Sequence, residues 1–348
     1  MQFKDVIGHE TLKSQLAASV RSGRIPHAQL FAGPEEAGTL PLALAYAQYL
    51  QCRNRTETDS CGRCPACLQM AGYMHPEVHF VFPVIKERSD KAALSDDRLS
   101  VWREALTANP YLTYAEWMDR IREGTKQGGI FVEESAALLR KLAFTATEDS
   151  YKIVILWMAD RMGPATSNKL LKLLEEPSEK TVFLLTTPSP QDLLPTVLSR
   201  MQTVRVPLEK GQRRAAAADE ACFGNFVRMM RTAYMAFSSN VAKNEMQHLF
   251  EWAAGMAQLS RDEQKAFLMY ALRMIRESYL ITMGMTSMTD LTAEEHAFVS
   301  RFAPFVNSRN VEEIAGLLNT ACAHIEMNGN QSLVFFDTGL QLAVSLHR

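Results

Sequence analysis

The sequence predicts a doubly wound α/β domain over residues 1–207, followed by an all-helical region. Short apolar runs alternate with helical patterns as far as Pro207, and such alternation is typical of helices that cover a parallel sheet. After Pro207 the chain is rich in Ala, Met and Leu, keeps a helical period and contains no strand signal. Its 348 residues, 47% hydrophobic and 22% charged, suffice for two or three domains.

The first elements follow from short local patterns. Leucines recur at helical spacing over residues 9–23, which predicts a helix. The apolar run AQLFA at residues 28–32 stops at Gly-Pro and predicts a buried strand that leads into a glycine loop. Pro41 suits the first turn of the following helix. Further helices are expected over residues 98–107, 114–124, 132–142, 166–176, 213–280 and 292–347.

The remaining strands lie later in the chain. Two continuous apolar runs, KIVILW at residues 152–157 and TVFLLTT at 181–187, fit strands buried on both faces of a parallel sheet. The alternating stretch QTVRVP at 202–207 predicts a last strand. Residues 75–129 have mixed polarity and many aromatic residues, so we expect a self-packed insertion there; a surface for a partner is the alternative.

Charge and hydropathy exclude several classes of protein. The formal net charge of −2 argues against a chain that binds DNA by itself, because such a chain needs a basic surplus. No run approaches the ~18–20 apolar residues of a membrane span. The charged N-terminus lacks the apolar core of a signal peptide. A cytoplasmic protein is expected.

Four cysteines with the spacing C-x8-C-x2-C-x2-C are the strongest single signal. Two Cys-x2-Cys steps let thiolates converge on one metal ion, and four thiolates make a closed, structural Zn²⁺ site. Unligated thiols are the weaker alternative because clustered exposed thiols oxidise readily. His75 and His79 are available but not needed, and Cys222 and Cys322 are expected as small core hydrophobes. The expected zinc ligands are Cys52, Cys61, Cys64 and Cys67.

A second motif has the outline of a phosphate-binding loop without its chemistry. Gly33 and Gly38 have the required spacing, but Thr39 stands in place of the Lys and Leu40 in place of the Ser or Thr. The Lys contacts the β- and γ-phosphates and the hydroxyl holds Mg²⁺, so neither function remains. We expect a degenerate loop that binds no nucleotide and hydrolyses none.

The end of the next core strand supports this interpretation. An ATPase of this type needs one carboxylate for Mg²⁺ and another that polarises water. Trp157 and Met158 stand where these acids are required, and Asp160 is expected to pair near the following helix. Two independent chemical requirements therefore fail together.

Ser199 and Arg200 precede the last expected strand. A guanidinium is a rigid, permanently charged fork of donors and suits phosphate contact. From chemistry alone, an ordinary surface or ion-paired arginine is the first interpretation. His27 is expected as a hydrogen-bonded core histidine.

Four segments together resemble one family. They are GRIPHAQLFAGP at residues 23–34, the four-cysteine module, NKLLKLLEEP at 168–177 and LLPTVLSR at 193–200. This combination is similar to the bacterial DNA polymerase III clamp-loader subunits of the AAA+ class, and most of all to those of delta-prime type. The resemblance covers residues 1–207 and continues more weakly to residues 328–346, which resemble the last collar helix.

The resemblance implies a three-part body. An AAA+ type domain over residues 1–207, with a zinc module at 52–67 and the insertion at 75–129, precedes a short helical lid at 208–250 and a helical collar at 251–348. The collar would assemble a ring of five subunits. The lid is expected to be shorter than the family pattern.

The resemblance also implies a stator without enzymatic activity of its own, within a DNA polymerase III holoenzyme. Arg200, preceded by Ser199, would act in trans, so that ATP binds only at neighbouring subunits. Met201 replaces the cysteine of the family's Ser-Arg-Cys motif. The implied partners are the tau/gamma motor and delta subunits, the sliding clamp and, through the assembled complex, primed DNA.

Two other functions stay open. An ATP-hydrolysing motor-type subunit would turn over ATP as a single chain. A stand-alone, zinc-dependent DNA-binding protein would bind DNA in a salt-sensitive manner.

Overall fold

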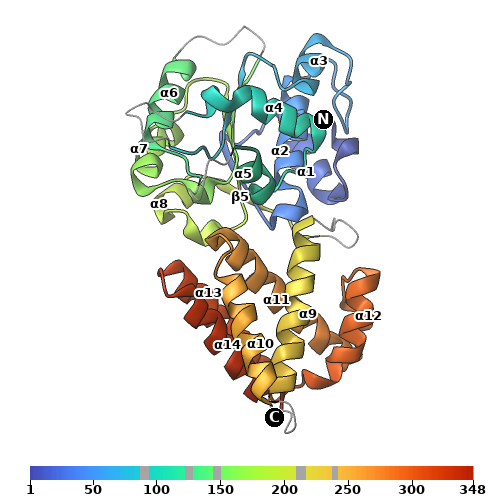
Figure 1. The fold of residues 1–348 in the computed structure, drawn as a ribbon. Helices are drawn as coiled ribbons and strands as arrows, with labels where there is room; N and C mark the ends of the chain where they lie inside the picture. Colours follow the sequence, from blue (N-terminus) through green and yellow to red (C-terminus); the bar gives the residue numbers. More distant parts are fainter. Residues whose placement is uncertain (87–93, 122–127, 144–149, 209–216, 237–241, 348) are drawn as a thin grey trace. The chain divides into compact units, whose positions relative to one another are not determined.

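The computed structural model describes residues 1–86, 94–121, 128–143, 150–208, 217–236 and 242–347. Two compact units make up the chain, Met1–Arg213 and Arg214–Arg348 (Figure 1). Across these described ranges, no helix is both long and apolar enough to cross a membrane.

The first unit is built on a five-stranded parallel sheet with the order β2-β3-β4-β1-β5. β3 and β4 are buried along their whole length, as their continuous apolar sequences predict. The predicted parallel sheet is therefore confirmed. The strands are β1 (Ala28–Ala32), β2 (Val78–Val81), β3 (Lys152–Leu156), β4 (Thr181–Thr187) and β5 (Gln202–Arg205).

Helices cover both faces of this sheet. Successive side chains of a buried strand point to opposite faces, so both faces are apolar and each needs a covering layer. Leu30 lies in one apolar cluster and Phe31 in another. The cluster of Leu30 includes residues of α6 (Val132–Leu142), α7 (Pro164–Glu175) and α8 (Pro195–Leu198). The cluster of Phe31 includes residues of α1 (Glu10–Arg21) and α2 (Thr39–Gln51), on the other side of the sheet in Figure 1.

The region between β2 and α6 packs on the unit's own core. Its helices are α4 (Leu99–Ala108) and α5 (Tyr114–Ile121). Trp102 and Trp117 are fully buried, and their rings lie 5.1 Å apart. The self-packed interpretation of these aromatic residues is confirmed. Short 3₁₀ helices complete the unit at Phe3–Asp5, Glu35–Ala37, Ser95–Arg98, Ala159–Arg161 and Pro190–Asp192.

Most element bounds agree with the sequence patterns, but two elements were not expected. β1, β4 and α6 have the predicted limits. α2 begins at Thr39, so that Pro41 is its third residue. α3 (Pro65–Ala71) and β2 carry no clear signal of their own; β2 is only the four residues VHFV, interrupted by a histidine.

The second unit is helical throughout its described residues, apart from connecting loops, as predicted. All six α-helices contribute to one apolar core, and Cys222 and Cys322 pack against it. The helices are α9 (Ala217–Ala236), α10 (Ala242–Met256), α11 (Arg261–Thr282), α12 (Ala293–Phe302), α13 (Val311–Glu326) and α14 (Gln331–Leu346), with 3₁₀ helices at Thr286–Met288 and Ala303–Phe305.

Local capping explains where α11 begins. The Ser260 side chain accepts a hydrogen bond from the backbone N–H of Glu263, whose carboxylate accepts one in return from the backbone of Ser260. α9 and most of α10 fall in the segment expected as a lid, yet they share the core with α11–α14. The division of residues 208–348 into lid and collar stays a prediction.

Candidate functional sites

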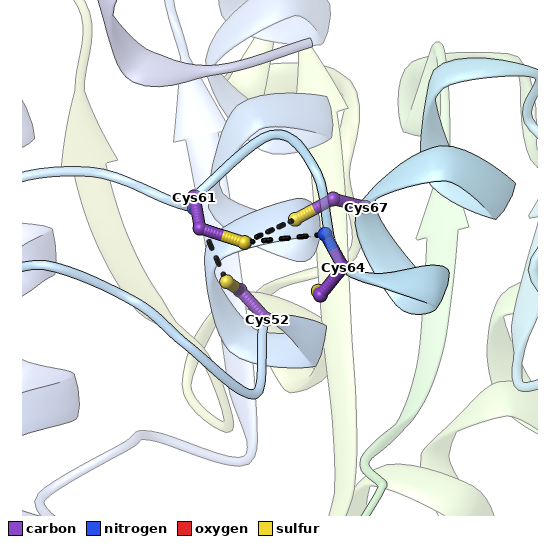
Figure 2. Close-up of side chains that lie close together, drawn as sticks. All are labelled: Cys52, Cys61, Cys64 and Cys67. Atoms are coloured by element: carbon purple, nitrogen blue, oxygen red, sulfur yellow. Dashed lines mark hydrogen bonds between the residues drawn. The ribbon is translucent and has the colours of Figure 1, made fainter.

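The four cysteines of the spacing motif converge on one point. Figure 2 shows their side chains turned toward one another. All four sulfur atoms lie within 4.8 Å of one another, and all six cysteines of the chain are free thiols. The predicted convergence is confirmed, and the cluster could hold a metal ion. Its members are Cys52, Cys61, Cys64 and Cys67.

Local backbone structure brings these thiols together. Cys52 caps the C-terminus of α2, and Cys64 caps the N-terminus of α3, which begins at Pro65. Gly62 adopts a left-handed conformation, φ +69°, that turns the chain between them. The N–H of Cys61 donates to the sulfur of Cys52 at 3.2 Å.

The donor set fits a tetrahedral metal. Thiolates bound to Zn²⁺ at ~2.3 Å lie about 3.8 Å from one another, which is within the spread of this cluster. The N–H of Cys64 donates to the sulfur of Cys61 at 3.3 Å, and such bonds stabilise thiolate charge. Hydrogen bonding from the Arg63 backbone lowers the pKa of Cys61 to about 6. Among the described residues, neither His75 nor His79 belongs to the cluster.

The glycine loop that follows β1 is tightly packed. A Cβ added at Gly33 would lie 2.0 Å from the carbonyl oxygen of Val206, so only glycine fits beside the chain that follows β5. Gly38 has a φ of +75° and caps the N-terminus of α2. The two residues that replace the Lys and the hydroxyl, Thr39 and Leu40, are buried. The absence of an ATP site at the N-terminus of α2 stays a prediction.

The insertion contacts this loop directly. The backbone N–H of Tyr114 donates to the Glu35 carboxylate at 2.6 Å, so an acidic side chain of the loop caps α5. Burial raises the pKa of Glu35 to about 7. Tyr111 lies against Gly38, and its hydroxyl accepts a hydrogen bond from the N–H of Ile7 at 2.7 Å. These contacts occupy the space beside the loop.

Aromatic packing also surrounds the end of β3. Trp157 is buried, and its ring lies 5.1 Å from that of Trp102 in the insertion. Asp160 accepts a hydrogen bond from the Thr187 hydroxyl at 2.8 Å and lies 3.4 Å from the Nε atom of Arg161. Asp160 thus pairs locally, as expected.

Arg200 lies at an open pocket of about 490 Å³. Its Nη2 atom is 2.5 Å from Oε1 of Glu175, and its Nη1 atom donates to the Thr196 carbonyl at 2.7 Å. The structure therefore places Arg200 as a partly exposed, ion-paired residue. The pocket is lined by His27, Leu174, Glu175, Ser199, Arg200, Met201 and Gln202.

Two neighbours of Arg200 bear on the expectations from sequence. His27 donates to the carbonyl of Leu174 at 3.1 Å, as a hydrogen-bonded histidine should. Its expected place in the core is wrong, because the ring is exposed and lines the pocket. Met201 is buried in the apolar cluster under α7, so its thioether packs while Arg200 stays at the surface.

Sequence reasoning missed three residues at these sites. Glu175 lies inside the segment that carries the family resemblance, but nothing in its spacing indicates a contact with Arg200. Tyr111 and Tyr114 are among the aromatic residues of the insertion, and the sequence does not indicate what they contact. Their partners lie in the glycine loop, far away in the sequence.

Comparison with known proteins identifies the family. Residues 8–210 match the family model described as DNA polymerase III, delta subunit. The DNA polymerase III subunit delta' of Pseudomonas aeruginosa is 29% identical over 57% of this chain and 48% of its own length. The corresponding subunit of Bacillus subtilis is 28% identical over 53% and 44%.

The chain is also similar to a gamma/tau subunit and to a solved structure. The gamma/tau subunit of Mycobacterium tuberculosis strain H37Rv is 25% identical over 57% of this chain and 27% of its own length. The chain thus spans less than half the length of these curated relatives. A DNA polymerase III gamma subunit-related protein of Thermotoga maritima aligns over 97% of this chain and 98% of its own at 14% identity, with a TM-score of 0.36. Because the family model matches more than half of the sequence, the chain belongs to the DNA polymerase III delta subunit family.

Proposed function

We propose that this chain is the non-hydrolysing, delta-prime-type stator of a DNA polymerase III clamp loader. In this role it donates Arg200 in trans to the ATP site of a neighbouring tau/gamma-type subunit while the sliding clamp is loaded onto primed DNA. The delta subunit, the clamp and the DNA are proposed partners through the assembled complex. Family membership and the delta' relatives support this assignment.

One contrast within the first unit carries the proposal. The chain's own loop lacks a cation and a Mg²⁺ ligand and is packed against Tyr111, whereas the Arg200 guanidinium lies at an open pocket. The first unit offers the Arg200 guanidinium no phosphate of its own. The guanidinium is therefore suited to contact the phosphate of an ATP bound by a neighbouring subunit.

The chemistry required of Arg200 is electrostatic. Phosphoryl transfer spreads negative charge over the γ-phosphate oxygens, and an arginine supplied in trans accelerates it by ~10³–10⁵. Ser199 lies beside the guanidinium, and its hydroxyl accepts a hydrogen bond from Nη1 at 3.5 Å. We assign Ser199 the role of orienting Arg200.

We also propose that the four-cysteine cluster holds one structural Zn²⁺. Four protein thiolates complete a tetrahedron and leave no position for substrate, so the ion would stabilise the fold. The cluster joins the C-terminus of α2 to the N-terminus of α3. Zinc would therefore fix the helix that follows the glycine loop.

The test replaces Arg200 with Ala and measures DNA-stimulated ATPase of the reconstituted complex. At the ATP site that receives Arg200, turnover is expected to fall by about 10³-fold or more. The total ATPase rate of the complex should then fall by the part that this site contributes. Arg205→Ala is the matched control, since Arg205 is an exposed arginine of the neighbouring strand β5. Unchanged turnover of a folded Arg200→Ala complex would contradict the trans role.

A further inference from the structure

The guanidinium of Arg200 is already engaged at both terminal nitrogens. Nη2 pairs with Oε1 of Glu175 at 2.5 Å. Nη1 donates to the carbonyl of Thr196 at 2.7 Å and to the hydroxyl of Ser199 at 3.5 Å. An arginine can bind a phosphate bidentately through these two nitrogens. A phosphate that binds Arg200 through both terminal nitrogens therefore competes with Glu175.

Glu175 is an unusual residue for its position in the helix. It is the last residue of α7, where the macrodipole disfavours a negative charge. Helix stability therefore does not explain a carboxylate there, whereas the adjacent guanidinium of Arg200 does. The side chains of Arg200 and Glu175 remain 36% and 46% exposed. An ion pair this exposed is weak and easily exchanged.

The surroundings allow the exchange. Glu175 and Arg200 both line the open pocket, so the guanidinium can change partners without displacing packed side chains. A nucleoside triphosphate carries more negative charge than one carboxylate, and phosphate accepts the same bidentate geometry. A triphosphate presented at this pocket would outcompete Glu175, whereas water would not.

We propose that Glu175 is a positioning residue that restrains Arg200 in a charge-neutralised state until a neighbouring subunit's triphosphate displaces it. This inference rests on the proposed function of Arg200. It assigns Glu175 the task of keeping ATP turnover low before the complex is fully assembled on DNA.

The first measurement needs no partner. The purified full-length chain is treated with the arginine reagent phenylglyoxal, and modification of Arg200 is followed by mass spectrometry. Glu175→Gln should raise the modification rate of Arg200 about two- to fivefold, because the amide keeps the shape and removes the charge. Fivefold corresponds to about 1 kcal/mol, the upper range for an exposed ion pair. Glu176→Gln, at the next exposed residue, should leave the rate unchanged.

The second measurement uses the reconstituted complex with its motor subunits. Glu175→Gln should raise the ATPase rate without DNA about two- to fivefold and leave the DNA-stimulated rate unchanged, so that the stimulation ratio falls. Glu176→Gln should not alter this ratio. A purely structural role of Glu175 would lower both rates and the melting temperature together.

The outcomes separate the two ideas. Faster modification of Arg200 together with a lower stimulation ratio supports the restraint. In one outcome, Glu175→Gln changes neither the modification rate of Arg200 nor the ATPase rate without DNA, while Arg200→Ala still lowers ATP turnover. In that case the restraint is wrong and the trans role stands. If Arg200→Ala leaves turnover unchanged, the proposed function fails, and the inference fails with it.

Discussion

The ring of Tyr111 lies so close to Gly38 that a Cβ added at Gly38 would be 2.9 Å from its Cε1 atom. Gly38 caps the N-terminus of α2, the position from which a phosphate-binding loop holds its anion. Tyr111 comes from the insertion and is anchored by the N–H of Ile7. We propose that this contact closes the loop, in addition to the loss of the groups that bind ATP in the motif.

Restoring those groups should not restore nucleotide binding. The double substitution Thr39→Lys and Leu40→Thr recreates the loop sequence, but Tyr111 and the Glu35 carboxylate still occupy its surroundings. We expect no saturable binding of a fluorescent ATP analogue to either the wild-type chain or this variant. Saturable, Mg²⁺-dependent binding by the restored loop alone would contradict steric closure.

Gly38→Ala should destabilise the first unit more than Gly23→Ala. Both glycines have positive φ, +75° and +68°, so an alanine at either costs about 1–2 kcal/mol. Gly23 has no atom within 4 Å of an added Cβ, whereas Gly38 has the Tyr111 ring. The additional stability that Gly38→Ala loses relative to Gly23→Ala should become smaller when Tyr111→Ala is also introduced. Equal melting temperatures for the two alanine variants would show that the Tyr111 ring moves away from the added Cβ without a cost in stability.

The sequence alone predicts those features that depend on nearby residues. β1 and β4 are continuous apolar runs, and the four cysteines lie within one short stretch. The replacement of the motif's Lys and hydroxyl is also readable, because each of these residue types has a fixed place in the motif. In all these cases the ligands or neighbours are close in the chain.

The remaining features depend on tertiary contacts. β2 was missed because its four residues become a strand only beside β3, which follows much later in the chain. The contact of Tyr111 with Gly38 and the pairing of Arg200 with Glu175 each join separate segments. Neither contact leaves a periodic trace in the sequence, so neither could be predicted from pattern.

Zinc removal should unfold the region around α3. Metal analysis is expected to give about one Zn per chain, because the cluster offers a single set of four thiolates. Chelation or Cys64→Ser should lower the melting temperature by about 10 °C or more, since structural zinc contributes on the order of 10 kcal/mol of apparent binding free energy. Cys322→Ser should retain the metal. A folded, metal-free wild-type chain would refute the zinc assignment.

The Glu35 carboxyl should make stability depend on pH. Its pKa is raised by burial to about 7, against about 4.3 in an unfolded chain. The folded state then binds this proton more tightly, so the free energy of unfolding falls as the pH rises from about 4.3 to 7. Glu35→Gln removes this loss and keeps an acceptor for the N–H of Tyr114. Because Glu35 is partly exposed, the gain at pH 8 should be on the order of 1 kcal/mol.

Urea unfolding at pH 4 and pH 8 provides the measurement. In a Trp252→Phe background, the three remaining tryptophans all lie in the first unit and report on it alone. The free energy of unfolding of Glu35→Gln should equal that of its parent at pH 4 and exceed it at pH 8. The same substitution at the exposed neighbour, Glu36→Gln, should leave the free energy of unfolding unchanged at both pH values. Glu134, whose pKa is also raised by burial to about 7, preserves part of the pH dependence in every variant. An increase in the free energy of unfolding of the same size at both pH values would mean that Glu35 does not titrate between pH 4 and pH 8. It would also mean that the hydrogen bond from α5 does not depend on the charge of Glu35.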